Sequence, residues 1–312
     1  MKTLLPLLRP HYWPTWLALG TLKALEPLPY VVLAALGRGV GSLAARLPLS
    51  FVRIARTNIG ICLPELSDQQ RELLVKEHFK SLGVGIFETA LSWWASKSRI
   101  AKLTQLEGVE HLRAALERGR GAILLSAHFT TLEIGGRVLC DGHPGSVNVM
   151  YRPTGNAVLE RFLARNRSRQ AKRAIPRDDV RTLITSLKAN EPVWYAPDQA
   201  YRKKGAEMVP FFGIPAATNT ATSRLARMTG AAVLPYFQER LPSGKYRMVI
   251  YPMLEDFPSD DPVADAKRFN HLIELQVRRT PEQYLWIHRR FKGLTPDYPD
   301  YYKRKPTIKT SG

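Results

Sequence analysis

The chain has 312 residues, of which 46 are Lys or Arg and 27 are Asp or Glu, so its formal net charge is +19. This length allows one large domain or two ordinary ones, and the positive charge predicts a polyanionic partner such as anionic lipid, nucleic acid or an acidic protein. Cys62 and Cys140 are the only cysteines; they exclude a disulfide framework and a cysteine metal site, and they suit a reducing cytosol.

One long apolar stretch, Tyr12–Leu36, dominates the N-terminal part of the sequence. No secretory signal is expected, because the leading apolar run is short and no small-residue cleavage site follows it. Trp13 and Trp16 suit a membrane interface, and the arginines after the stretch suit anionic headgroups. Internal charges and prolines leave three structures open: a single membrane span, two short helices with a proline joint, or a buried helix pair. We expect residues 1–48 to form a hydrophobic membrane-anchoring segment.

Residues 51–97 are predicted to be helical. Ser67 followed by Gln70 is the pattern of a capping box, and apolar residues at helical spacing follow it. The aromatic residues of this part are more typical of packing than of a binding site.

From about residue 103 onward, short apolar runs alternate with helical patterns. The predicted strands are Ala122–Leu125, Val147–Tyr151, Pro192–Ala196, Val233–Gln238 and Tyr246–Tyr251. The predicted helices are His111–Arg118, Ala157–Ala171, Val180–Ala189, Asn219–Met228 and Val263–Arg279. This alternation predicts an α/β fold with a largely parallel central sheet flanked by helices. The tail from Thr295 is rich in Pro, Lys and Tyr and is expected to be loose.

Three polar residues each come just after a predicted strand. They are His128, Arg152 and Asp198. Ligands of such sheets gather outside the carboxyl ends of the strands, so the sequence predicts that these residues share one edge. Asp198 is equally able to bind a substrate or to hold its loop.

His128 and Glu133 are the strongest candidates for catalysis. A separation of five residues would place them about 140° apart on one regular helix, so a helix capped by Thr130 must begin after His128. Glu133 in its first turn can then accept a hydrogen bond from one ring nitrogen, and the other nitrogen can act as a general base. The alternative is that Thr130 and Glu133 only form a capping box and His128 is a packed core residue.

Other catalytic motifs are missing from the sequence. There is no H-E-x-x-H zinc motif, no phosphate-binding G-x-x-x-x-G-K-[ST] loop and no G-x-S-x-G elbow. We expect no metal and no cofactor. Arg152, Arg167 and Arg169 are candidates for binding a phosphorylated or acidic substrate, or else they belong to a solvated basic face.

Several blocks of the sequence resemble the lipid A late acyltransferases, the lauroyl and myristoyl transferases of Gram-negative bacteria, within the lysophospholipid acyltransferase superfamily. The blocks occur in order over nearly the whole chain: HFTTLEIG, MYRPTGNAVLERF, EPVWYAPDQAYRKKG, PFFGIPAATNT, GAAVLPYF and PEQYLWIHRRFK. The wider superfamily usually has H-x4-D, and Glu133 matches the form of the lipid A branch. The E-G-T-R block of glycerolipid acyltransferases is missing.

The resemblance implies that residues 49–312 form an acyltransferase domain. It implies transfer of a lauroyl or similar chain from acyl carrier protein to a hydroxyl of a Kdo-modified tetraacyl lipid A precursor, at the cytoplasmic face of the bacterial inner membrane. His128 would be the general base and Glu133 its partner. Backbone N–H groups near His128 or an arginine would stabilise the oxyanion. A basic surface suits both acyl carrier protein, which is acidic, and a phosphorylated lipid.

Two rival functions remain open at this point. One is an acyltransferase that acts on another bacterial membrane lipid. The other is a non-enzymatic basic protein of the membrane surface, which would explain the charge but not the placement of His128. No zinc finger, RNA-recognition signature or heptad pattern points to nucleic acid.

Overall fold

A central sheet organises the computed structural model, which describes residues 5–143 and 147–303. Within these residues the sheet has seven strands in the order β1-β9-β8-β2-β5-β3-β4. Their bounds are β1 Thr104–Glu107, β2 Ala122–Leu125, β3 Asn148–Tyr151, β4 Arg173–Pro176, β5 Pro192–Tyr195, β8 Ala232–Arg240 and β9 Tyr246–Ile250. Each of the five predicted strands is present, and β1 and β4 are additional.

The sheet is mostly parallel, as expected. The five strands β8, β2, β5, β3 and β4 run parallel to one another, whereas β9 is antiparallel to β8 and pairs in parallel with β1. The central strand β2 is Ala-Ile-Leu-Leu, and all four residues are buried. Such a continuous apolar run is typical of a parallel strand that is covered on both faces.

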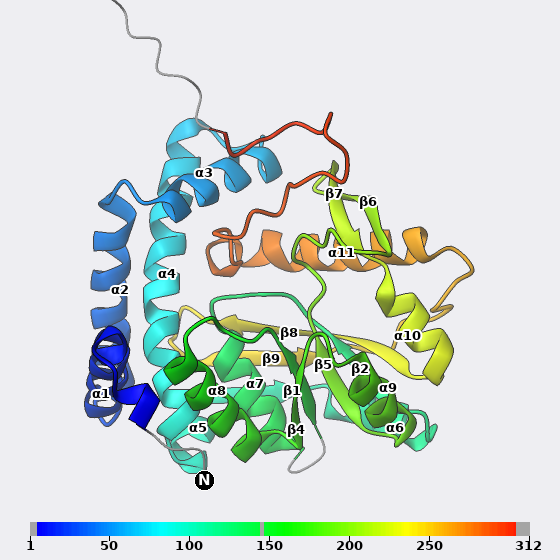
Figure 1. The fold of residues 1–312 in the computed structure, drawn as a ribbon, viewed down its shortest axis with the longest axis horizontal. Helices are drawn as coiled ribbons and strands as arrows, with labels where there is room; N and C mark the ends of the chain where they lie inside the picture. Colours follow the sequence, from blue (N-terminus) through cyan, green and yellow to red (C-terminus); the bar gives the residue numbers. More distant parts are fainter. Residues whose placement is uncertain (1–4, 144–146, 304–312) are drawn as a thin grey trace, which may run out of the picture.

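Helices cover both faces of the sheet. Ile123 and Leu125 of β2 pack into a core shared with α9 (Val180–Lys188), α10 (Ala221–Thr229) and α11 (Pro262–Arg279). Ala122 and Leu124 point the other way, into a core shared with α6 (Val109–Glu117) and α7 (Leu132–Gly142). This alternation follows from the period of two in a strand. β2 is the fourth of the seven strands, in the middle of the sheet, and Figure 1 shows it between β5 and the helices α6 and α9.

The N-terminal part consists of helices. They are α1 Trp13–Leu25, α2 Tyr30–Arg46, α3 Ser50–Cys62, α4 Asp68–Trp94 and α5 Lys97–Leu103. The predicted capping box is confirmed at the start of α4, where Ser67 and Gln70 bond reciprocally. Of the three structures left open for Tyr12–Leu36, the structure has two helices separated by the Pro27–Pro29 segment. In Figure 1, α2 stands alongside the much longer α4 at one side of the molecule.

The lengths and compositions of the N-terminal helices bear on whether they can cross a membrane. Within residues 5–143 and 147–303, no single helix is both long and apolar enough to cross a bilayer, whereas α2 and α3 pass this test as a pair bent by 88°. The boundary expected after residue 48 falls in the short turn between α2 and α3. The anchoring role of residues 1–48 stays a prediction.

Two expectations for the C-terminal half are wrong. The helix expected to begin at Asn219 begins at Ala221, because Asn219 ends the second strand of a hairpin, β6 (Ala206–Phe211) and β7 (Ile214–Asn219). The tail from Thr295 is not loose as far as it is described, since Tyr302 is buried and its hydroxyl bonds to Asn58 Oδ1 at 2.7 Å. The remainder of the predicted tail, residues 304–312, lies outside the described residues.

Candidate active site

His128 and Asp198 meet at the carboxyl ends of two adjacent strands. His128 follows β2 and Asp198 follows β5, and these strands pair in parallel. The pairing continues past the strands, where the Ser126 N–H donates to the carbonyl of Tyr195 at 2.9 Å. Two residues that are 70 positions apart in the sequence are therefore brought together by sheet topology, as predicted.

The carboxylate of Asp198 holds His128 at two points. One oxygen lies 2.6 Å from Nδ1 of the ring, and the other accepts the backbone N–H of His128 at 3.0 Å. An ionised carboxylate only accepts hydrogen bonds, so Nδ1 carries the proton and Nε2 is left for proton exchange. The Asp198 side chain is 2% exposed, whereas that of His128 is 25% exposed. The ring is therefore fixed from the buried side and reachable from the other.

The electrostatics of this pair favour the charged forms. Burial lowers the pKa of His128, but the charge and the hydrogen bond of Asp198 outweigh burial, so the pKa is raised above its ordinary value. Burial raises the pKa of Asp198, but His128 and then the buried Arg290 outweigh it, so this pKa is lowered. Asp198 thus stabilises an imidazolium, which is the form that His128 takes after it has accepted a proton.

A C-terminal segment encloses the pair. Tyr284 forms an isolated antiparallel bridge with Phe129, and the Leu285 N–H donates to the carbonyl of His128 at 2.9 Å. His288 accepts the N–H of Ala200 through Nε2 at 3.1 Å, and burial lowers its pKa to about 4, so it is neutral. The segment therefore holds the loops of both His128 and Asp198, although sequence reasoning assigned it no role in the site.

Arg290, in the same segment, is a buried cation with fixed partners. It donates to the carbonyl of Ala217 at 2.8 Å and to the hydroxyl of Thr218 at 2.7 Å. It is 2% exposed, and burial lowers its pKa. Sequence reasoning missed this residue as well. A signal existed in the run His288-Arg289-Arg290 after an apolar segment, but nothing local says which arginine turns inward.

The predicted capping role of Thr130 is wrong. Helix α7 begins at Leu132, and its N-cap residue is Thr131, which makes no side-chain capping bond. Thr130 is used elsewhere, because its hydroxyl bonds to the Ser81 hydroxyl at 2.8 Å and its N–H donates to the carbonyl of Gln283 at 2.7 Å. These two contacts anchor the His128 loop to α4 and to the C-terminal segment.

Glu133 also has a different partner from the one expected. Its carboxylate is ion-paired with Arg167 of α8 (Ala157–Gln170), and it accepts the indole N–H of Trp93 at 3.3 Å. Among the described contacts, the hydrogen bond to Nδ1 of His128 comes from Asp198 and not from Glu133. Glu133 sits in the first turn of α7 and faces α4 and α8, whereas the His128 ring turns toward the end of β5.

The other predicted binding residues are placed as follows. Arg152 comes directly after β3, the strand next to β5, so it lies at the same edge, and its side chain is exposed. Arg169 is exposed on α8, whereas Arg167 is half-buried and lies over the Tyr151 ring at 5.4 Å. Their roles stay predictions. Within the described ranges, no group of three or more His, Cys, Asp or Glu side chains is arranged to hold a metal ion.

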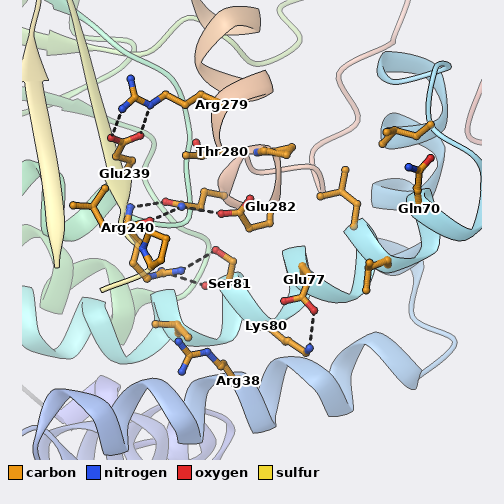
Figure 2. Close-up of a pocket in the computed structure, with 18 residues that line it drawn as sticks. Arg38, Gln70, Glu77, Lys80, Ser81, Glu239, Arg240, Arg279, Thr280 and Glu282 are labelled. Carbon is orange, nitrogen blue, oxygen red and sulfur yellow. Dashed lines mark hydrogen bonds and ion pairs between the residues drawn. The ribbon is translucent and has the colours of Figure 1, made fainter. Parts of the chain in front are cut away.

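A groove of about 740 Å³ lies next to the His128 loop but is not lined by His128 or Asp198. It runs between α2, α4, the end of β8 and the segment after α11, and Figure 2 shows Arg240 in it, directed at Ser81. Ser81 and Gln283, which line the groove, are the two residues that hold Thr130. The groove includes none of the candidate catalytic side chains, so its volume does not make it the place of chemistry.

The fold and the site define an α/β enzyme with a histidine–carboxylate pair at the edge of a parallel sheet. A sequence model of the family described as "Bacterial lipid A biosynthesis acyltransferase" matches residues 1–293. The chain belongs to this family, and it is an acyltransferase of lipid A biosynthesis. The resemblance stated from the sequence blocks is thereby confirmed.

Three relatives from Escherichia coli (strain K12) illustrate the range within the family. The chain is 39% identical to a lipid A biosynthesis lauroyltransferase over 298 residues, which is 95% of this chain and 97% of that one. It is 40% identical to a palmitoleoyltransferase over 287 residues, covering 91% and 93%. It is 29% identical to a myristoyltransferase over 304 residues, covering 95% and 92%. The lauroyl and palmitoleoyl relatives are nearly equally similar to this protein, although their names give different acyl groups. The comparison therefore favours neither acyl group.

Proposed function

We propose that this enzyme transfers a lauroyl or similar fatty acyl chain from acyl carrier protein to a hydroxyl of a Kdo-modified tetraacyl lipid A precursor. The reaction takes place at the cytoplasmic face of the bacterial inner membrane. The names of the lauroyl and palmitoleoyl relatives support the acyl group and the lipid A acceptor. The observation that carries the mechanism is the buried Asp198 carboxylate, 2.6 Å from Nδ1 of a partly exposed His128.

The proposed mechanism is general-base catalysis by His128. Nε2 takes the proton of the acceptor hydroxyl as its oxygen attacks the carbonyl carbon of the thioester. Asp198 keeps the ring oriented and balances the charge of the imidazolium. The tetrahedral intermediate collapses with cleavage of the carbon–sulfur bond, and the departing thiolate takes the proton from His128. The acyl group comes from the thioester, so the reaction balances without a metal or a further cofactor.

The oxyanion of the intermediate needs hydrogen-bond donors. The N–H groups of His128 and Thr130 are already engaged, by Asp198 and by the Gln283 carbonyl. Arg167 is proposed as a donor among the predicted residues. It is held by Glu133, and its planar guanidinium can donate from one edge to Glu133 and from another to a substrate oxygen.

In this proposal Glu133 acts through Arg167 and not as the hydrogen-bond partner of the base. Arg152 and Arg169 are exposed cations around the same edge, and they are proposed to attract the phosphates of the acceptor or the acidic surface of the carrier. Residues 1–48 are proposed to contact the membrane in which the acceptor lies.

The test is an acyl-transfer assay with the detergent-purified full chain. Acyl carrier protein loaded with acyl chains of several lengths is the donor, and the Kdo-modified tetraacyl precursor is the acceptor. We expect wild type to form the pentaacyl product and His128→Ala to lower kcat/KM roughly 10²- to 10⁴-fold. His271→Ala is the matched control, because His271 is exposed on α11, and it should retain the wild-type rate.

Each alternative gives a different outcome. If His128→Ala folds and transfers acyl chains at the wild-type rate, the general-base mechanism is wrong. If wild type acylates another bacterial lipid but not the lipid A precursor, the acceptor is wrong and the family's chemistry remains.

A further inference from the structure

The outer side of α2 carries an apolar stripe with no protein partner. Its large members are Val32, Leu36, Val40, Leu43 and Leu47, each 41–60% exposed. Four of these residues, Val32 to Leu43, form a shallow groove with Val31, Ala35 and Gly39, and it is lined by apolar residues alone. Of the 17 large apolar side chains that are exposed in the described chain, ten lie between Leu8 and Leu47. The exposed apolar surface is thus concentrated on one region, which marks an interaction site.

The opposite side of α2 is part of the folded core. Leu33 and Ala34 are 1% and 2% exposed. Gly37 and Gly41 bring the backbone of α2 against that of α4, since a Cβ atom on Gly41 would lie 1.9 Å from the carbonyl oxygen of Phe79. Backbones this close leave no room for α2 to turn or to slide along α4. The two helices are therefore one rigid element.

This packing decides how α2 can meet a bilayer. If α2 crossed the hydrocarbon, the neighbouring stretch of α4 would go with it, including Glu77 and Lys80. Figure 2 shows these two side chains paired on the side of α4 that faces α2, near Arg38, and the ion pair measures 2.7 Å. Charged side chains facing hydrocarbon are strongly unfavourable. An orientation with α2 parallel to the surface immerses the stripe and leaves these charges in the headgroup region or in water.

The charges around the stripe favour an anionic lipid surface. Between residues 7 and 64 the sequence has one acidic residue, Glu26, and it is buried and paired with Arg99 at 3.0 Å. Arg9, Arg38 and Arg46 are exposed, and within the described residues none of the three takes part in an ion pair. An apolar stripe flanked by cations alone is the pattern of a helix that lies in the interface of anionic lipids.

We propose that the enzyme is monotopic, with α2 lying in the plane of an anionic bilayer and its stripe from Val32 to Leu47 inserted into one leaflet. This proposal rests on the proposed membrane location. It specifies that the outer side of α2 is the surface that contacts the lipid. α1 also exposes large apolar side chains, Trp13 and Leu17. The remainder of the fold then stays on the cytoplasmic side of that leaflet.

The test measures depth along α2. Single cysteines at positions 32, 36, 40, 43 and 47, each carrying an environment-sensitive fluorophore, are bound to vesicles of phosphatidylglycerol and phosphatidylethanolamine. The native Cys62 and Cys140 are buried. Quenchers are placed at different depths on the lipid chains. We expect all five labels to lie at one shallow depth, within about 5 Å of each other. A label at the exposed Glu207 of β6 should stay in water.

Two outcomes would overturn the proposal. A spanning helix would give a steady change of depth of about 1.5 Å per residue, or roughly 20 Å along the stripe. A protein partner, such as a second copy of the chain, would shield all five labels from every lipid quencher and change the sedimentation of the protein without vesicles. Neither outcome depends on acyl transfer, so a failure here is distinguishable from a failure of the proposed function.

A second measurement uses charge insertion. Val32→Glu combined with Val40→Glu should lower the vesicle-bound fraction at least about tenfold in a flotation assay. Val180→Glu, at a similarly exposed valine on α9, should leave it unchanged. Acyl transfer to a detergent-dispersed acceptor should persist in the double variant. If the folded double variant floats with vesicles as wild type does, the stripe is not the membrane contact.

Discussion

Asp198 and Glu133 are both carboxylates paired with a basic side chain near one sheet edge, but the regions that hold them differ in burial. Asp198 is almost fully buried, and it faces Arg290 and Tyr284 as well as His128. Glu133 and Arg167 have side chains that are 20% and 19% exposed, at the junction of α7 and α8.

The difference in burial separates two functions. A buried carboxylate with several fixed partners cannot exchange them for a substrate, because an unpaired charge there would be costly. It is suited to positioning the base. A partly exposed ion pair can open toward an incoming anion or carbonyl oxygen at a small cost. We therefore assign positioning to Asp198 and substrate contact to the Glu133–Arg167 pair.

Among substitutions at these two carboxylates, Asp198→Asn should have the largest effect on catalysis. An amide can donate to Nδ1, which moves the ring proton to Nε2 and blocks the base, so we expect kcat to fall roughly 10²- to 10³-fold. The substitution also leaves the buried Arg290 without its facing anion, so the melting temperature should fall. Asp178→Asn, at an exposed site, is the matched control for both measurements. Wild-type kcat in a folded Asp198→Asn variant would refute the assignment.

The pH profile tests the same assignment independently of rate. The base must be neutral, and the raised pKa of His128 places the acidic limb of kcat/KM above the ordinary histidine value of about 6.5. In Asp198→Asn the effect that raises this pKa is removed while burial, which lowers it, remains. The limb should therefore move to lower pH. Profiles measured between about pH 5 and pH 9 would contradict the pairing if the limb did not move.

Glu133→Gln should have a smaller effect, because Arg167 loses an orienting partner but keeps its charge. We expect kcat/KM to fall roughly 10- to 100-fold with the acidic limb unchanged. The double variant with Arg167→Lys should lose less than the sum of the single losses, since the two residues act as a unit. Glu207→Gln, on the exposed side of β6, is the control. A greater loss in Glu133→Gln than in Asp198→Asn would reverse the assignments.

The smallest effects are expected at the exposed arginines. Arg152→Ala and Arg169→Ala should each raise KM by about two- to tenfold with little change in kcat, because exposed charges attract a substrate but are screened. The increase should shrink in high salt. Arg181→Ala, an exposed position on α9, is the control. An equal effect of salt on wild type and on both variants would show that neither arginine contacts the substrate.

The sequence predicted the strand ends well because each strand is a short apolar run followed directly by polar or turn-forming residues. The four-residue run of β2 is apolar throughout and is bounded by glycine and by Ser126, and β5 ends before Pro197-Asp198. Topology then brings these ends together without further information. The sequence also predicted the cap of α4 at Ser67, where both partners lie within one turn.

The partners of Glu133 and Thr130 could not be read from the sequence in the same way. Arg167 is 34 residues from Glu133, and Ser81 is 49 residues from Thr130. The sequence spacing allowed both a capping box of Thr130 with Glu133 and a hydrogen bond between Glu133 and His128. In the folded chain, Thr130 and Glu133 instead bond to residues that are distant in the sequence. The pairing of β6 with β7 was missed because Pro210 and Pro215 lie within the two strands. Proline has no backbone N–H to donate, so its presence argues against a strand.

The close contact between α2 and α4 also bears on how this enzyme can be handled in solution. A cut after residue 48 would remove α2 and expose the face of α4 that receives Gly37 and Gly41. Such a truncated chain should aggregate rather than become soluble. A detergent-free enzyme is better sought by keeping α2 and replacing the stripe from Val32 to Leu47 with polar residues, because this changes the membrane-facing surface and leaves the helix pair intact.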